Sequence, residues 1–587
     1  TPIKNLTIRS TVDFSTNSTK LDYYQSAYLL GSSYTGNKST PFLKSVDAYR
    51  ASGFGYNTYW STTASYNWDI TDKMNLNAVA GYDFEYNSAF NVRQDDRTDA
   101  DNPIAYLGTS IKNVMGANLW TGSSSNTNYV FDAMFTRLIF NYDSKYVLSG
   151  SLRRDRSSKF GPDNRAGLFY SASGAWNITE ESWMKPLTWL SLAKVRASYG
   201  VTGNDQIGSY YAWISTIKTD HNVVFGTSSI PSYYPGGYSN RELGWEKNKQ
   251  YDLGIDLAFF NRINLNVDLY KRTSDIVMPA NIPNFNGIAS SVYMNSGQVE
   301  NKGIELSLNA KVLQGAFNWE TTLNWSMNKN KILSLANNQT QLANGKAGTK
   351  WGNVIRNIVG RPMGDMYMLK VIGTYNTEED LQKYPKFGTE GIGDLIFEDT
   401  NGDKVVNAND YQHVGNYQPD FTYGWNNKFS YKNFDLAVTI DGQVGGKVIY
   451  AAARAFSLNR WDDNVLKESG LGRWQSPENP GNGKSHKAGT NNLGSNIQPS
   501  TRYLYDADFL RIRNVALGYT LPTQICRYIG LQRVRFSANV QNLVTFDKYP
   551  GYSVEANYNG NSATNNGVDF GGYPIARVMT FGINATF

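Results

Sequence analysis

The sequence has little of the material from which disulfides, most metal centres and helical membrane anchors are built. Its 587 residues include one cysteine, Cys526, and three histidines. A single cysteine excludes an internal disulfide and argues against a thiolate metal site, and no two histidines lie at a metal-ligand spacing. No stretch approaches the roughly 20 apolar residues that a membrane-spanning helix needs.

Excess charge and catalytic motifs are also absent from the sequence. The formal net charge of +6 is small for this length, and no basic run alternates with aromatic residues. We therefore expect no nucleic-acid partner. No Ser/His/Asp set and no HExxH motif occurs, and isolated carboxylates are more often solvated than catalytic. The chain is not expected to be an enzyme.

Aromatic residues and glycine, in contrast, are abundant. The chain has 40 Tyr, 27 Phe, 14 Trp and 53 Gly, yet its mean hydropathy is only −0.47. In the last stretch, Arg577–Phe587, apolar and small polar residues alternate one by one. A period of two indicates a strand whose two faces meet different solvents. Such dilution of apolar by polar positions is typical of strands in outer-membrane barrels.

The alternation recurs along the chain and predicts about 16 strands. The clearest examples are Tyr251–Phe259, Ile263–Leu269, Ile304–Lys311, Phe317–Trp325 and Phe434–Val444. One further strand, Phe509–Leu521, changes phase near Asn514, where we expect a β-bulge. The charged residues of these strands share a face opposite the aromatic ones. A barrel with a wet lumen explains both faces, whereas a soluble all-β protein, the alternative, explains neither well.

The predicted connections alternate between short and long. Short turns are expected at Thr71–Lys73, Asp143–Lys145, Phe260–Arg262, Leu313–Ala316 and Tyr431–Asn433. Long loops are expected at Ser15–Gly53, Asn91–Asn126, Asp155–Arg165, Thr202–Leu243, Met278–Gln298, Ile332–Asp420, Gly445–Asp506 and Gln541–Ile575. Short periplasmic turns and long extracellular loops are the rule in outer-membrane barrels. The sequence thus predicts an all-β, transmembrane, antiparallel up-and-down barrel, with Phe587 at the periplasmic edge.

Several segments, in order along the chain, resemble the SusC/RagA-type TonB-dependent outer-membrane transporters of Bacteroidetes. The resemblance runs from about Asn75 to the end, and Arg156 stands where glycine is expected. It is carried by Ser151–Arg165, Asn240–Glu246, Asn295–Glu305, Asp508–Tyr519 and the run from Asn542-Leu543 to Gly551-Tyr552.

The resemblance implies more than composition and spacing do. Members of this family are barrels closed by an N-terminal plug, driven through TonB and capped by a SusD-like surface lipoprotein. Plugged transporters of this type have 22 strands. Residues 1–587 are therefore expected to be a partial barrel in the outer membrane, without the plug, a signal peptide or about six strands that would precede Thr1.

One loop, Asp399–Asp410, has the spacing of a calcium-binding loop. Oxygen side chains at positions 1, 3, 5 and 12 can wrap a hard cation, and the residue at position 7 adds its backbone carbonyl. Position 12 is Asp rather than bidentate Glu, and Lys404 stands where the sharp turn usually takes Gly. The alternative is an ordinary Asx-rich surface turn. The predicted Ca²⁺ ligands are Asp399, Asn401, Asp403, Val405 and Asp410.

Tyrosine-rich segments within Thr202–Leu243 are candidate substrate contacts. Exposed rings there could stack on sugar faces or peptide side chains. The alternative is that they pack the loop or touch the lipoprotein. The candidates are Tyr210, Tyr211, Trp213, Tyr233 and Tyr234.

The sequence leaves two functions open. The first is import of oligosaccharides or oligopeptides by the full transporter, together with a SusD-like lipoprotein and TonB. The second is a scaffold or docking subunit in a multi-protein outer-membrane complex that has no transport activity of its own.

Overall fold

A computed structural model shows that the chain is built almost entirely of antiparallel β-structure. It describes residues 4–25, 45–99, 121–282, 291–347, 351–457, 464–489, 493–558, 560, 562 and 564–587. The chain divides into two compact units. Unit 1 is Thr1–Ser173, Gly200–Asn248 and Val277–Asn295, and unit 2 is Gly174–Tyr199, Lys249–Ile276 and Ser296–Phe587. Within these described residues, no helix is both long and apolar enough to cross a membrane.

The main sheet has sixteen strands, which confirms the strand number expected from the alternation. Neighbours in the sheet follow one another along the chain, and every pair with a determined register is antiparallel. The up-and-down topology is therefore confirmed. The strands are β1 (Leu6–Gln25), β2 (Ser45–Thr71), β3 (Met74–Asp99), β4 (Thr121–Tyr142), β5 (Tyr146–Ser157), β6 (Ala166–Asn177), β7 (Leu190–Asn204), β10 (Glu246–Phe259), β11 (Ile263–Asn281), β12 (Ser291–Leu313), β13 (Phe317–Ser334), β20 (Phe421–Tyr431), β21 (Phe434–Val444), β24 (Phe509–Thr520), β25 (Arg533–Asp547) and β27 (Val578–Thr586).

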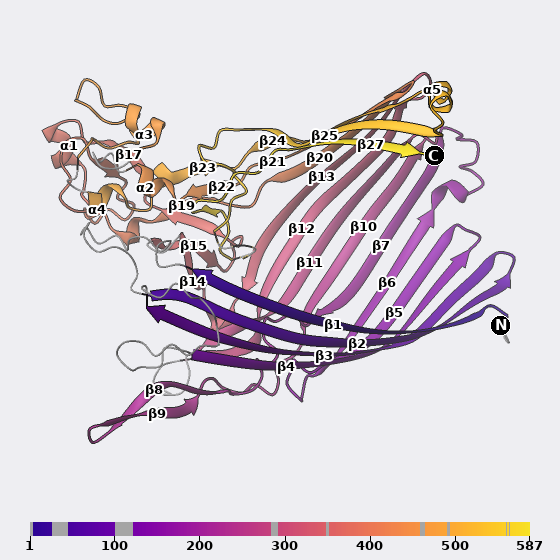
Figure 1. Cartoon of the computed structure of the whole chain (residues 1–587), viewed down its shortest axis with the longest axis horizontal. Coiled ribbons are helices and arrows are strands. Elements are labelled where there is room, and N and C mark those ends of the chain that lie inside the picture. The colour runs from indigo at the N-terminus through magenta and orange to yellow at the C-terminus, as the bar shows by residue number, and fades with distance from the viewer. Residues whose placement is uncertain are drawn as a thin grey trace. The chain divides into compact units, whose positions relative to one another are not determined.

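The first strands of unit 1 are longer than the alternation predicted. Two loops were predicted to begin too early, at Ser15 (Ser15–Gly53) and at Asn91 (Asn91–Asn126). These bounds are wrong, because β1 runs to Gln25 and β3 runs to Asp99. Figure 1 shows β1 to β4 side by side as long arrows. Beyond the apolar alternation of β1, residues 15–20 are polar on both faces while the backbone pairing continues. A period-based analysis detects only the part of a strand whose faces differ.

Left-handed residues close the tight turns at the predicted places. Asp143 and Ser144 have φ of 51° and 57°, and Phe260 and Asn261 have φ of 54° and 53°. Two consecutive left-handed residues make the type I′ turn, whose twist matches that of the flanking strands. The predicted turns Asp143–Lys145 and Phe260–Arg262 are thereby confirmed.

The predicted β-bulge in β24 is also confirmed. Thr439 of β21 pairs with Asn514, whereas the next residue, Ile440, pairs with Ile512. Arg513 is therefore the extra residue, and it accounts for the phase change in the sequence.

The long connections of unit 2, expected as loops, contain secondary structure of their own. Residues between β13 and β20 form a four-stranded sheet of β14 (Gln341–Ala347), β15 (Trp351–Ile358), β16 (Asp365–Met368) and β19 (Gln412–Asn416), the pair β17 (Val371–Thr374) and β18 (Leu395–Phe397), and α1 (Glu378–Lys383). Residues after β21 and β25 form β22 (Lys447–Tyr450), β23 (Leu504–Asp506) and β26 (Val568–Asp569), with α2 (Ala453–Phe456), α3 (Lys467–Leu471) and α4 (Leu493–Asn496). In unit 1, residues after β7 form the hairpin of β8 (Ile217–Phe225) and β9 (Ser228–Pro235).

Three of these connections in unit 2 share one hydrophobic core. Its buried members include Trp351 and Met366 from the first connection, Ile449 and Tyr503 from the second, and Val568 from the third. Figure 1 shows the short elements of unit 2 gathered at one end of its long strands, with α5 (Thr523–Tyr528) and the C-terminus at the other end. Within unit 2, long and short connections thus lie at opposite ends, as the sequence predicted.

Candidate functional site

Three acidic residues on the strands of unit 2 gather around one arginine. The Arg196 guanidinium of β7 lies 3.4 Å from an Asp252 carboxylate oxygen and 3.2 Å from one of Asp256, both in β10. It also lies 2.5 Å from the Asp268 carboxylate of β11. Carboxylates paired with an arginine in this way stabilise the polar face of the sheet. This cluster does not place a nucleophile beside a general base.

A second charged group ties a long connection to the same sheet. Arg511 of β24, whose side chain is 4% exposed, lies 2.6 Å from Asp441 of β21 and 2.6 Å from Glu555. Arg513 also pairs with Asp441, at 2.9 Å. Glu555 belongs to the connection between β25 and β27, so the ion pair anchors that connection to the sheet.

The predicted calcium loop adopts the turn that its spacing requires. Lys404 has φ of 67°, so a residue with a Cβ occupies the left-handed position, as expected. The Asp399 carboxylate accepts hydrogen bonds from the backbone N–H of Gly402 at 2.7 Å and of Lys404 at 2.9 Å. The first position of the loop thus folds the chain back on itself.

The remaining predicted ligands are held by backbone amides. Asn401 accepts from the Asp403 N–H at 2.9 Å, and Asp403 accepts from the Val405 N–H at 2.8 Å. Asp410 is fully buried and accepts from the Thr400 N–H at 2.9 Å. Within the part of the chain that the structure describes, no three His, Cys, Asp or Glu side chains are grouped to hold a metal ion. Calcium binding therefore stays a prediction.

Three of the predicted substrate residues contact β4 and the turn between β5 and β6. The Tyr210 ring lies 6.1 Å from that of Tyr129 and 5.2 Å from the Lys159 ammonium. The Tyr211 hydroxyl accepts from the Asn128 N–H at 3.1 Å. The Trp213 ring lies 5.6 Å from the guanidinium of Arg165. These contacts are the packing expected of the alternative interpretation.

The other two predicted residues lie on the β8–β9 hairpin. Tyr233 is 77% exposed, and Tyr234 is opposite Lys218 in the hairpin register. The structure therefore separates the five candidates into a packed group and a hairpin group. Their role in substrate binding stays a prediction.

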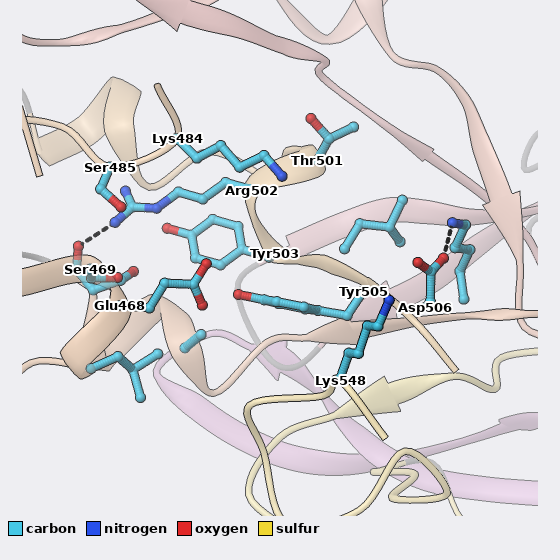
Figure 2. Close-up of a pocket in the computed structure, with 15 residues that line it drawn as sticks. Glu468, Ser469, Lys484, Ser485, Thr501, Arg502, Tyr503, Tyr505, Asp506 and Lys548 are labelled. Carbon is cyan, nitrogen blue, oxygen red and sulfur yellow. Dashed lines mark hydrogen bonds and ion pairs between the residues drawn. The ribbon is translucent and has the colours of Figure 1, made fainter. Parts of the chain in front are cut away.

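A pocket of about 320 Å³ lies among the long connections of unit 2. Figure 2 shows Arg502 and Tyr503 at its wall, with the Tyr503 hydroxyl on the same side as the Arg502 guanidinium. Arg502 is held in place, because its two terminal nitrogens bond to His486 Nδ1 and to the Ser457 carbonyl oxygen, both at 2.8 Å. The pocket wall is therefore built in advance of any ligand.

Burial sets the chemistry of two tyrosines in this pocket. The Tyr503 ring packs against Trp351 with centroids 4.8 Å apart, and the side chain is 1% exposed. Its hydroxyl has no hydrogen-bond partner among the described residues. Burial, and to a lesser extent the negative charge of Glu468, raises the pKa of the Tyr505 hydroxyl to about 12. The Tyr505 phenol therefore stays protonated, and can donate, at any physiological pH.

Sequence reasoning missed this pocket altogether. Its lining comes from β22, α3, β23 and the residue after β25, which are far apart in the sequence. No motif has such spacing, and only the run Thr501–Asp506, with one arginine and two tyrosines, is unusual in composition.

Comparison with known proteins gives a consistent result. A family model described as "TonB dependent receptor-like, beta-barrel" matches residues 2–543. TonB-dependent receptor P3 of Formosa agariphila is 31% identical over the whole chain, which covers 57% of that protein. TonB-dependent receptor SusC of Bacteroides thetaiotaomicron is 28% identical over 77% of the chain, which covers 43% of it. The chain thus spans about half the length of these relatives.

A solved structure shows the same fold. The structure of the RagAB peptide transporter matches the whole chain with a TM-score of 0.80 at 22% identity, and the match covers 60% of that protein chain. At this identity the match establishes the β-barrel fold alone.

Proposed function

The chain belongs to the TonB-dependent receptor-like β-barrel family, and from this premise we propose that it forms the later part of the barrel of a nutrient importer. It is an outer-membrane protein that crosses the membrane with its strands, and it is not an enzyme. On this proposal, the plug and about six further strands are supplied by residues that precede Thr1 in the whole protein.

The proposed cargo is an oligosaccharide or an oligopeptide, taken up with a SusD-like surface lipoprotein and with energy from TonB. The family match over residues 2–543 is the observation that carries the proposal. The named relatives support it further, since one is SusC and the solved structure is described as a peptide transporter. The long connections of unit 2 support it too, because a shared core and a polar pocket suit ligand capture outside the membrane.

Copurification tests the partner. When the full-length protein is tagged and extracted from the outer membrane, we expect a SusD-like lipoprotein to copurify in comparable amount, because importers of this type work with such a lid. Mass spectrometry of the eluate measures this.

The reading frame upstream of Thr1 is expected to encode a plug. Several unrelated envelope proteins without a lipoprotein would instead support a scaffold subunit, and a stop codon upstream with no plug nearby would contradict import.

We also propose that Asp399–Asp410 binds Ca²⁺ and thereby stabilises the connection between β13 and β20. The support is the spacing of the oxygen ligands, the left-handed Lys404 and the buried Asp410 at the last position. The carboxylates would have to exchange backbone N–H partners for the cation. Extracellular loops of this kind bind Ca²⁺ with a Kd on the order of 10⁻⁴–10⁻³ M, so the role would be structural.

Removal of calcium tests this second proposal. We expect EGTA to speed cleavage of the connection between β13 and β20 by trypsin several-fold, because an unliganded loop opens more often. With calcium present, trypsin should cleave the Asp410→Ala variant at the rate that it shows for the wild type in EGTA. The control variant Asn409→Ala, next in sequence and outside the ligand positions, should be cleaved at the wild-type rate. An unchanged cleavage rate in EGTA would refute calcium binding at this loop.

A further inference from the structure

We propose that the pocket around Arg502 and Tyr503 binds a carboxylate group on a small extracellular ligand. This inference deepens the proposed function, and it rests on it for the statement that the pocket lies outside the membrane. The pocket has three properties that support it, which are its charge, its free donors and its size.

The lining of the pocket is positively charged. It contains four basic and two acidic side chains, and hence two positive charges in excess. Lys447 pairs with Asp506 and neutralises it. Arg502, Lys484 and Lys548 then outnumber the remaining acid, Glu468. A concave surface with one excess sign of charge concentrates ligands of the opposite sign.

Two buried hydroxyl groups at the pocket are left without a hydrogen bond in the described part of the chain. They are the Tyr503 hydroxyl and the Ser457 Oγ, on side chains that are 1% and 2% exposed. A buried polar group that finds no partner destabilises the fold by roughly 1–3 kcal/mol. Native proteins keep very few such groups, and a ligand oxygen is one way to satisfy them.

The guanidinium of Arg502 provides the matching charge. Two of its N–H groups are used on His486 and on the Ser457 carbonyl, which leaves further donors on the same fork. The guanidinium carbon of Arg502, Cζ, lies 5.5 Å from the centre of the Tyr503 ring. Figure 2 shows Lys484 and Lys548 along the same pocket. Charged donors beside a neutral hydroxyl are the groups that recognise a carboxylate.

The size of the pocket limits the ligand. About 320 Å³ is at the lower end of the range for small-molecule sites. It accommodates one sugar ring or one amino-acid residue. The carboxylate could therefore come from a uronic acid or from the C-terminus of a short peptide, and the pocket chemistry is the same for both.

Equilibrium binding tests the inference. Isothermal titration calorimetry on the full-length protein in detergent, at low ionic strength, would compare glucuronate with glucose and the dipeptide Ala-Ala with its C-terminal amide. We expect the carboxylate member of at least one pair to bind about tenfold more tightly, and the pair that responds identifies the source. Tyr503→Phe, which removes only the hydroxyl, should weaken that ligand about tenfold.

Two further variants make the test decisive. Tyr573→Phe alters a fully exposed tyrosine outside the pocket and should bind as wild type. Lys548→Gln removes one exposed charge without altering the core, so it serves if Tyr503→Phe does not fold, and it should lower affinity several-fold. The inference is overturned if neither pair shows a preference for the carboxylate, or if folded Tyr503→Phe and Lys548→Gln both bind as wild type.

The same measurement separates this inference from the import proposal. Binding in detergent needs neither TonB nor a membrane potential. A protein that imports its cargo but shows no carboxylate preference overturns the pocket assignment alone. A protein that binds carboxylate in the pocket but imports nothing overturns the import proposal alone.

Discussion

Replacing Asp441 by Asn should lower the free energy of unfolding of the chain by about 3 kcal/mol. The reason is that Arg511 is almost fully buried and would keep only the more exposed Glu555 as a counter-charge, while Arg513 would lose its ion pair with Asp441. Removal of one partner from a buried ion pair is strongly destabilising because the other charge stays out of water. Urea unfolding of the full-length protein in detergent, followed by tryptophan fluorescence, measures the change.

Asp435→Asn is the matched control for this prediction. Asp435 lies on the same strand, β21, and pairs with Arg535 of β25, but both side chains are about a third or more exposed. An exposed ion pair contributes only about 0–1 kcal/mol. Equal destabilisation by the two substitutions would show that burial of Arg511 does not set the strength of this contact.

The second large effect is expected in the core shared by the long connections of unit 2. Met366 is fully buried in that core beside Ile355 and Ile449. Met366→Ala would leave a cavity, and substitutions of this kind cost about 2–5 kcal/mol. Because the core joins three connections, we expect all three to become sensitive to protease together. Limited proteolysis with mass spectrometry of the fragments measures this.

Ile372→Ala is the control for the core substitution. Ile372 lies on β17, close in sequence to Met366, and its side chain is 45% exposed. Its truncation should leave the cleavage pattern unchanged. If Met366→Ala exposed only the connection that contains residue 366, the three connections would not share one cooperative core.

The sheet could be predicted from the sequence because its faces differ in polarity. In β21, Phe434, Leu436, Val438 and Ile440 alternate with Asp435, Ala437, Thr439 and Asp441. In β24, the phase change at Arg513 appears as a bulge. Where both faces are polar, as in residues 15–20 of β1, the period of two disappears although pairing continues. Strand existence was therefore predictable, and strand ends were not.

The site was less predictable, for a related reason. The turn at Lys404 follows from spacing within twelve residues, so local reasoning could place it. The pocket depends on Lys447, Arg502 and Lys548, which meet only because the connections fold on one core. Contacts of such long sequence separation leave no periodic signal, and in a single sequence nothing marks them.

The shared core also constrains how the sequence of this protein can evolve. Trp351, Ile449, Tyr503 and Val568 come from three different connections and pack on one another. A change of size in one connection must then be matched in the other two. Exchange of a single connection between related transporters should yield a protein that folds poorly, whereas exchange of all three together preserves the packing. The unit that can be exchanged between relatives is thus the whole assembly of connections and not any one of them.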